Sequence, residues 1–220
     1  MVNCGSTTRQ DFAAGMENSG PLKAFSLSEP DQLAAPILVN SPHSGDCYPA
    51  AFLAVTHLEI SDLRRSADLF MADIAAGAAR RGLPLMQVHL PRSFIDMNRE
   101  PLELDPTMFE GRLPPGVNSS SIRVTSGYGI LPRLVADSVE IYPRRIPADQ
   151  ALERISRFHA PYHAALGQRL AEMRHAHGHA LLLDCHSMPS TSSAGTARLA
   201  DVVLGDRHGT SCDPAIVACA

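Results

Sequence analysis

The sequence contains no tryptophan, and only 5% of its 220 residues are aromatic, although 45% are hydrophobic. A buried core must therefore be mainly aliphatic, and the chain has the length of one domain of ordinary size. Long apolar runs are also absent, which argues against a membrane-spanning helix, and the apolar centre of a secretory signal is missing from residues 1–20. The formal net charge is −4 without a block of one sign, so nothing indicates nucleic acid or an anionic membrane as a partner.

Paired cysteine motifs are missing as well. The five cysteines are scattered without a Cys-x-x-Cys spacing, so we interpret them as reduced thiols and expect a cytoplasmic protein. A Gly-x-x-x-x-Gly-Lys-Ser/Thr motif is also absent, which excludes a phosphate-binding loop of that type. Residues 1–30 are polar and lack a hydrophobic period, so we predict a loose lead-in there and one domain over 31–220.

The sequence does contain, twice, an apolar run that ends in a histidine. Residues 37–39 predict a buried strand that leads to His43 and to Gly45, which can take backbone angles that other residues avoid. Residues 181–183 predict a second strand, which leads to His186. If these strands are parallel neighbours, both imidazoles lie at the sheet edge where α/β folds bind ligands, and they could begin a zinc site. The alternative is that each histidine is a lone polar loop residue.

Two aspartates could complete such a site. Asp46 follows His43 by three positions, which is a possible metal-binding spacing, but we favour a solvated turn residue. Asp68 falls within a helix predicted over 61–82, on the flank of its apolar stripe, where water is the expected neighbour. The side chains that we expect to be buried along this stripe are Leu63, Ala67, Phe70, Ile74 and Ala78.

A strand predicted over 83–90 leads into a cluster of polar side chains. The guanidinium groups of Arg92 and Arg99 can each bind a carboxylate with two hydrogen bonds, and Asn98 adds amide donors. The cluster therefore suits recognition of an acidic small molecule. The alternative is an internal ion-pair network of the arginines with Asp96 or Glu100.

The remaining pattern alternates helix and strand. Residues 147–177 predict the longest helix, with Pro161 as a kink or break and Gly178 as its end. Three histidines near that end are explained by the helix dipole better than by a metal. Residues 200–205 predict another strand, and an apolar segment from Pro214 looks like the start of a helix. We expect an α/β fold with a mixed, largely parallel sheet flanked by helices.

Together these motifs resemble the N-formylglutamate amidohydrolase family, a branch of the zinc carboxypeptidase-like and aspartoacylase-like hydrolases. The resemblance implies a phosphorylase/hydrolase-like, zinc carboxypeptidase-like fold. The matching segments follow the family order over residues from about 36 to 220 and are Ser41-Pro42-His43-Ser44-Gly45, Arg65-Ser66-Ala67-Asp68, Arg92-Ser93-Phe94-Ile95-Asp96-Met97-Asn98-Arg99, Pro161-Tyr162-His163-Ala164-Ala165-Leu166, Asp184-Cys185-His186-Ser187-Met188 and Leu204-Gly205-Asp206-Arg207-His208-Gly209-Thr210-Ser211.

The resemblance also implies a zinc ion held by two histidines and one carboxylate. His43 and His186 match the histidine positions. The wider superfamily would use Asp46 as the carboxylate, whereas this branch implies Asp68, which we choose with Asp46 in reserve.

For the substrate, the resemblance implies a role for four polar residues. Arg92 would stabilise the oxyanion together with the metal, and Asn98, Arg99 and Arg207 would bind the substrate. The implied reaction is hydrolysis of N-formyl-L-glutamate, or of a related N-acyl acidic amino acid, to formate and glutamate in histidine degradation.

One family element has no counterpart. The superfamily's general base is a glutamate well downstream of the second histidine, and Asp201, Asp206 and Asp213 all come too soon. We therefore expect a domain that is truncated at its C-terminus. The alternatives are a non-catalytic metal- or ligand-binding remnant of the family and a structural fragment that folds only with a partner.

Overall fold

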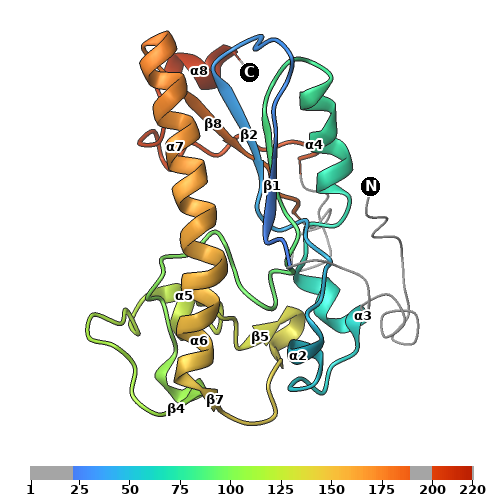
Figure 1. Ribbon diagram of the computed structural model, residues 1–220, viewed down its shortest axis with the longest axis vertical. Helices are drawn as coiled ribbons and strands as arrows, with labels where there is room; N and C mark the ends of the chain where they lie inside the picture. The colour runs from blue at the N-terminus through green and yellow to red at the C-terminus, as the bar shows by residue number, and fades with distance from the viewer. Residues whose placement is uncertain (1–21, 189–199, 220) are drawn as a thin grey trace. The chain divides into compact units, whose positions relative to one another are not determined.

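The computed structural model describes residues 22–188 and 200–219, which fall into two compact units that divide after His186. The first unit contains a four-stranded sheet in the order β1-β3-β2-β8 (Figure 1). β2 pairs in parallel with β3 and β8, and β1 pairs antiparallel with β3, so the sheet is mixed and largely parallel, as predicted. Its strands are β1 (Phe25–Ser28), β2 (Ile37–Ser41), β3 (Leu85–Val88) and β8 (Leu181–Asp184).

The other elements are mostly short. The paired strands are β4 (Phe109–Glu110) with β7 (Ile146–Pro147), and β5 (Leu134–Val135) with β6 (Val139–Glu140). The α-helices are α2 (Ala50–Leu53), α3 (Ile60–Leu63), α4 (Met71–Ala79), α5 (Ile122–Thr125), α6 (Ala148–Arg154), α7 (Ala160–His177) and, in the second unit, α8 (Pro214–Cys219). The 3-10 turns are η2 (Arg64–Ser66), η3 (Pro106–Met108) and η4 (Ala136–Ser138), and a π-helical turn, η5 (Ile155–His159), joins α6 to α7.

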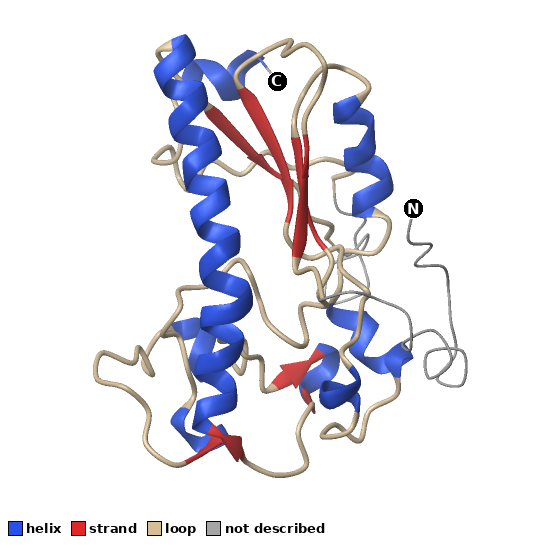
Figure 2. Cartoon of the chain, in the orientation of Figure 1, coloured by secondary structure: helices blue, strands red, loops and turns tan. Residues whose placement is uncertain are grey.

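Helices cover both faces of the four-stranded sheet (Figure 2). On one face, Ala75 of α4 packs with Val39 of β2 in a small buried cluster. On the other face, Tyr162 of α7 packs with Leu38 of β2 in the main core. Successive residues of a strand point to opposite faces, which is why the neighbours Leu38 and Val39 belong to different clusters.

The helix predicted over 61–82 is divided in two. Between η2 and α4 the chain breaks its helical path, and Phe70 takes a φ of 63°, a left-handed value that is rare for a bulky residue. Because the break resets the phase of the helix, the predicted buried stripe is wrong at two positions. Phe70 is 75% exposed and Ile74 is exposed as well, whereas Met71 and Ala75 are buried.

The helix predicted over 147–177 runs from α6 through η5 into α7, and Gly178 ends it with a φ of 79°, as predicted. In place of a break at Pro161, the helix widens into the π-helical turn directly before it. Proline has no N–H, and its ring crowds the carbonyl four residues earlier. The wider turn, in which the Ala160 N–H donates to the carbonyl of Ile155, accommodates the proline.

Two other expectations are wrong. Residues 200–205 form no strand within the described part of the chain, and Val202 and Val203 are exposed. β-branched residues favour strands only where a neighbouring strand can pair with them. Residues 25–28, inside the predicted lead-in, form β1, because they pair with β3; residues 1–21 lie outside the described residues. The domain boundary after residue 30 stays a prediction. Among the described helices, none is long and apolar enough to cross a membrane.

Candidate metal centre

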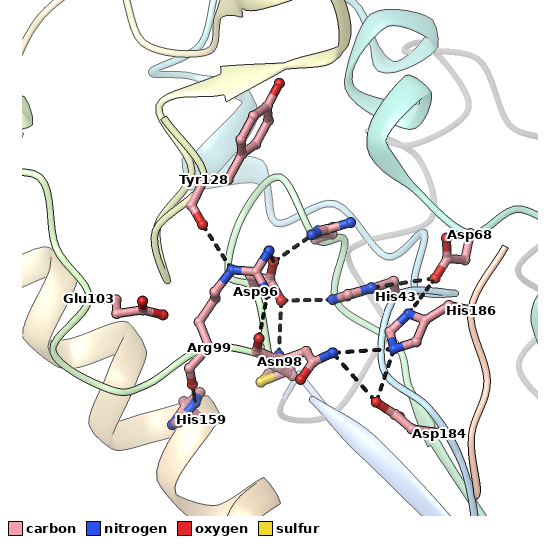
Figure 3. A network of polar contacts seen from close by, with 12 residues as sticks. His43, Asp68, Asp96, Asn98, Arg99, Glu103, Tyr128, His159, Asp184 and His186 are labelled. Atoms are coloured by element: carbon pink, nitrogen blue, oxygen red, sulfur yellow. Dashed lines mark hydrogen bonds and ion pairs between the residues drawn. The ribbon is translucent and has the colours of Figure 1, made fainter. Parts of the chain in front are cut away.

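The two predicted histidines meet at the carboxyl end of β2 and β8. The parallel register places Asn40 beside Asp184, and the loops that follow bring the rings of His43 and His186 to a centroid distance of 4.9 Å (Figure 3). The predicted convergence of the two strand ends is therefore confirmed.

Gly45 allows the His43 loop to lie against the end of β3. A Cβ at this position would lie 2.2 Å from the carbonyl oxygen of Leu90 and 2.6 Å from that of His89. Two positions further on, the Cys47 N–H donates to the His89 oxygen at 2.9 Å. The φ of Gly45 is not among the positive values, so close backbone approach, and not an unusual backbone angle, requires the glycine.

Asp68 joins the two histidines. Its Oδ2 lies 3.1 Å from Nδ1 of His186 and 3.4 Å from Nδ1 of His43, and its N–H donates to the His43 carbonyl. The break before α4 turns this buried aspartate inward, so the expectation of a water-facing side chain is wrong. Asp46 lies apart from the cluster and pairs with Arg64 at 3.4 Å.

The arrangement suits a metal ion. One ligand atom each from His43, Asp68 and His186 lies within 4.8 Å of the others. The buried Nδ1 of His43 makes no hydrogen bond to any residue that the structure describes. Two imidazole nitrogens and a carboxylate oxygen are a donor set of catalytic zinc sites, which keep a further position open. These three residues could therefore hold a metal ion.

Each histidine has a carboxylate partner on its outer nitrogen. Nε2 of His43 lies 2.7 Å from Oδ1 of Asp96, and Nε2 of His186 lies 2.9 Å from Oδ2 of Asp184. Carboxylates in such positions orient metal-binding imidazoles and raise their basicity. Both histidines thus direct Nδ1 toward the candidate metal position.

Asp96 is fully buried and has several partners. Its carboxylate accepts hydrogen bonds from Nε of Arg92 and from the backbone N–H of Asn98, both at 2.9 Å, and Nη2 of Arg99 lies at 3.4 Å. Burial alone would raise its pKa. The hydrogen bond with His43 and the nearby positive charges outweigh burial and hold the pKa of Asp96 well below its usual range.

Asp184 belongs to a chain of hydrogen bonds that begins on α7. The hydroxyl of Tyr162 donates to Oδ1 of the buried Asn40, whose Nδ2 donates to Oδ1 of Asp184 at 2.7 Å. The hydrogen bond that His186 donates to Asp184, followed by the one that it donates to Asp68, raises the pKa of His186 to about 9. Asp184, which is held through Asn40 by Tyr162, therefore contacts Nε2 of His186, and Asp68 contacts its Nδ1.

The two arginines of the predicted substrate site differ in their surroundings. Arg92 is 24% exposed, and beyond its Nε contact its terminal nitrogens have no partner in the described ranges. Arg99 is 5% exposed; besides Asp96, it donates to the carbonyls of Tyr128 and Asn98. The internal network that we considered as an alternative is thus present around Arg99.

Asn98 and Arg207 complete the set of predicted site residues. Asn98 is exposed beside the cluster, with Nδ2 3.2 Å from Nε2 of His186. Arg207 lies in the second unit, residues 187–220. The substrate-binding roles of Asn98, Arg99 and Arg207 stay predictions.

Sequence reasoning assigned no role in the site to Asp184, Asn40 or Tyr162. A signal existed for the first two, because each directly follows the apolar run of its strand. Tyr162 stands out in the sequence only as a member of one segment that matches the family. Asp96 was considered only as an ion-pair partner of arginine, because nothing in the sequence showed that it would meet His43.

A family model described as N-formylglutamate amidohydrolase matches residues 35–220. The chain belongs to this family. N-formylglutamate deformylase of Pseudomonas aeruginosa is 27% identical over 186 residues, which are 83% of this chain and 64% of that protein. The chain thus spans less than two thirds of the length of this curated relative.

Solved structures show the same fold. N-formylglutamate amidohydrolase from Ralstonia eutropha JMP134 is 33% identical, with a TM-score of 0.82 over 90% of this chain and 71% of that chain. A gene product from Agrobacterium tumefaciens is 16% identical, with a TM-score of 0.56 over 78% of this chain and 59% of that chain, and is similar in fold alone. The predicted family and the α/β class are therefore confirmed.

Proposed function

We propose that this chain is part of a zinc-dependent hydrolase that cleaves the amide bond of N-formyl-L-glutamate, or of a related N-acyl acidic amino acid. The products would be formate and glutamate, a reaction of histidine degradation. The observation that carries the proposal is the cluster of His43, Asp68 and His186, with Arg92 on a neighbouring segment, whose terminal guanidinium nitrogens have no partner among residues 22–188 and 200–219. The Pseudomonas relative is named an N-formylglutamate deformylase and the Ralstonia relative an N-formylglutamate amidohydrolase, which supports N-formylglutamate as the substrate.

His43, Asp68 and His186 would hold the zinc, which, when bound, supplies a Lewis acid and lowers the pKa of a water molecule. Asp96 and Asp184 contribute by orienting the imidazoles. Each carboxylate accepts a hydrogen bond from Nε2–H of its histidine, which leaves the lone pair of Nδ1 directed toward the metal position.

Arg92 is suited to bind the formyl oxygen. Asp96 holds its Nε, so the terminal nitrogens keep a defined direction while they are free to donate. A donor that meets the developing oxyanion is worth roughly 10²–10³-fold in kcat. We assign this role to Arg92, and we expect Arg92→Ala to lower kcat by that factor with little change in zinc content.

Asn98 lies beside His186, and its Nδ2 donates to Oδ2 of Asp184 at 3.4 Å; we propose that its amide turns a donor to a substrate carboxylate. We also propose Arg99 and Arg207 as carboxylate ligands. Arg99 would have to exchange one of its present partners, the carbonyls of Tyr128 and Asn98 or the carboxylate of Asp96, for the substrate. If it does so, Arg99→Ala raises KM for an acidic substrate more than it lowers zinc content.

The test is hydrolysis of N-formyl-L-glutamate by the purified chain, first loaded with zinc, then treated with a chelator, then reloaded. Formate release that follows the metal would support the proposal. Stoichiometric zinc without formate release would instead favour the alternative of a binding remnant that lacks a general base.

A matched pair of aspartates tests the metal assignment separately. Asp68→Ala should abolish stoichiometric zinc binding, because it removes one of three ligands. Asp46→Ala should leave zinc binding unchanged, because Asp46 pairs with Arg64 away from the cluster. Equal loss in both variants would contradict the choice of Asp68.

A further inference from the structure

Residues 91–99 carry Arg92, Asp96 and Asn98 but form no helix or strand. Backbone carbonyls in such a segment need partners outside a regular ladder of hydrogen bonds. The position of these three side chains therefore depends on whatever holds the carbonyls of this segment.

Basic side chains from one helical stretch supply these partners. Three of them contact carbonyl oxygens of residues 94–99, and Figure 3 shows His159 beside Arg99. The contacts are Arg154 Nη1 to Phe94 at 3.2 Å, His163 Nε2 to Met97 at 2.8 Å and His159 Nε2 to Arg99 at 2.9 Å.

The π-helical turn η5 explains how one helix presents all three. His163 follows His159 by four positions, so on an α-helix the two side chains are only about 40° apart around the helix axis. His159 follows Arg154 by five positions, which on an α-helix would leave the two side chains about 140° apart. Hydrogen bonds of the i→i+5 type place residues five positions apart on one face. Because η5 spans Ile155–His159, Arg154 joins the two histidines on the side that faces the segment.

We propose that His159 and His163 are positioning residues for the reaction proposed above, on which this inference rests. By holding the carbonyls of Arg99 and Met97, they keep Asp96 directed at His43 and Asn98 beside His186. Neither histidine touches a metal ligand in the described contacts, and both act through the backbone of the segment.

Burial distinguishes His163 from Arg154 and from His159, both of which are buried. Arg154 is buried among aromatic rings, with Cζ 4.3 Å from the centre of the Phe94 ring, so packing explains its presence. His163 is exposed, and its ring contacts His159 at a centroid distance of 4.2 Å. Core packing does not account for an exposed histidine, whereas its hydrogen bond to Met97 does.

The chemistry of the contact suggests the variants. A carbonyl oxygen only accepts, so each imidazole must donate its Nε2–H. His163→Gln keeps an N–H that can reach the same carbonyl, and His163→Ala removes it. His175→Ala is the matched control, because His175 is exposed on the same helix α7.

Hydrogen exchange tests the contact without using activity. The N–H groups of Asp96 and Asn98 are bonded to the Ile130 carbonyl and to the Asp96 side chain, so their exchange reports the order of the segment. In zinc-loaded protein, His163→Ala should speed exchange of the peptide that covers 94–100 by about tenfold, the effect of one lost hydrogen bond. His163→Gln and His175→Ala should exchange like the wild type.

Kinetics then test the consequence for the reaction. His163→Ala should lower kcat/KM for N-formyl-L-glutamate by about 10- to 100-fold, mostly through kcat, with zinc content unchanged, and His163→Gln should recover most of it. Wild-type exchange in His163→Ala, or no recovery with glutamine, would overturn the inference. An inactive wild type would instead refute the proposed function, and the exchange comparison would still decide whether the histidines hold the segment.

Discussion

The loops that carry His43 and His186 use the same arrangement at different depths. Each follows a parallel strand, directs Nδ1 at the candidate metal position and pairs Nε2 with an aspartate. The His43 side chain is 2% exposed and its partner Asp96 is 0% exposed. The corresponding fractions for His186 and Asp184 are 35% and 32%.

Because of this difference in burial, substitutions in the two loops should have different effects on protein stability. A buried charged group that loses its partner destabilises the protein strongly, whereas a half-exposed group is compensated by water. Changes around His43 should therefore reduce both stability and metal binding. Changes around His186 should reduce metal binding while the fold is kept.

The largest effect is expected for Asp96→Ala. This change leaves His43, Arg92 and Arg99 without their shared buried partner, and breaking a buried ion pair costs about 3–5 kcal/mol. The free energy of unfolding from urea titration of the metal-free chain should fall by this amount. A loss below about 1 kcal/mol would show that the His43 loop contributes no more to the free energy of unfolding than the His186 loop does.

Gly45→Ala should have the next largest effect on the His43 loop. The added Cβ meets the backbone of His89 and Leu90, which cannot move away as a flexible side chain would. Such overpacking typically costs about 1–3 kcal/mol. Urea unfolding and zinc titration should both show the loss. Gly167→Ala is the control, because outside the backbone of its own helix no atom of the described residues lies within 4 Å of the Cβ that would be added there.

Asp184→Asn should act on metal binding alone. The oxygen of the new amide can still accept the hydrogen bond from Asn40, while its N–H points at Nε2 of His186. Nε2 must then accept, so the imidazole proton moves to Nδ1, the nitrogen that faces the metal position. Zinc affinity measured by competition with a chelator should fall about 10- to 100-fold. The free energy of unfolding should change by less than about 1 kcal/mol. A loss as large as that of Asp96→Ala would show that the two loops do not differ.

The smallest effect is a pH dependence of the metal-free protein. Hydrogen bonds that His186 donates to Asp184 and to Asp68 raise its pKa from 6.5 to about 9. A raised pKa in the folded state means that the protonated form stabilises the fold fully below pH 6.5. This stabilisation is lost progressively as the pH rises toward about 9. The Tm of the metal-free wild type should therefore fall over this range relative to His186→Gln. If the plots of Tm against pH are parallel for the wild type and His186→Gln, the pKa of His186 is not raised.

Local pattern was sufficient for much of the fold. The apolar runs at 37–39 and 181–183 predicted β2 and β8, and Gly178 predicted the end of α7, because these signals depend on neighbouring residues alone. The buried stripe of the helix over 61–82 was predicted wrongly. Its periodicity continues through residues 67–70, where the chain bends away from the helix to bring Asp68 to the histidines.

The network around the site could not be predicted from the sequence. Asp96 and His43 are 53 positions apart, and Tyr162 and Asn40 are 122 positions apart, so no spacing connects them. Their contacts arise because β2 lies between β3 and β8 and α7 covers one face of the sheet. Arg99 likewise has its partners only because residues 91–99 fold back toward Tyr128.

The sequence by itself determined β2, β3 and β8, the histidines that follow β2 and β8, the family and the residue types able to hold a metal, since these follow from local pattern and side-chain chemistry. The family resemblance already favoured Asp68 over Asp46, but only the tertiary structure showed that Asp68 contacts both histidines and that Nδ1 of each imidazole faces the centre. The physical reason is that ligand geometry depends on atoms from distant segments. Their positions are set by sheet register, by the break before α4 and by the π-helical turn before α7.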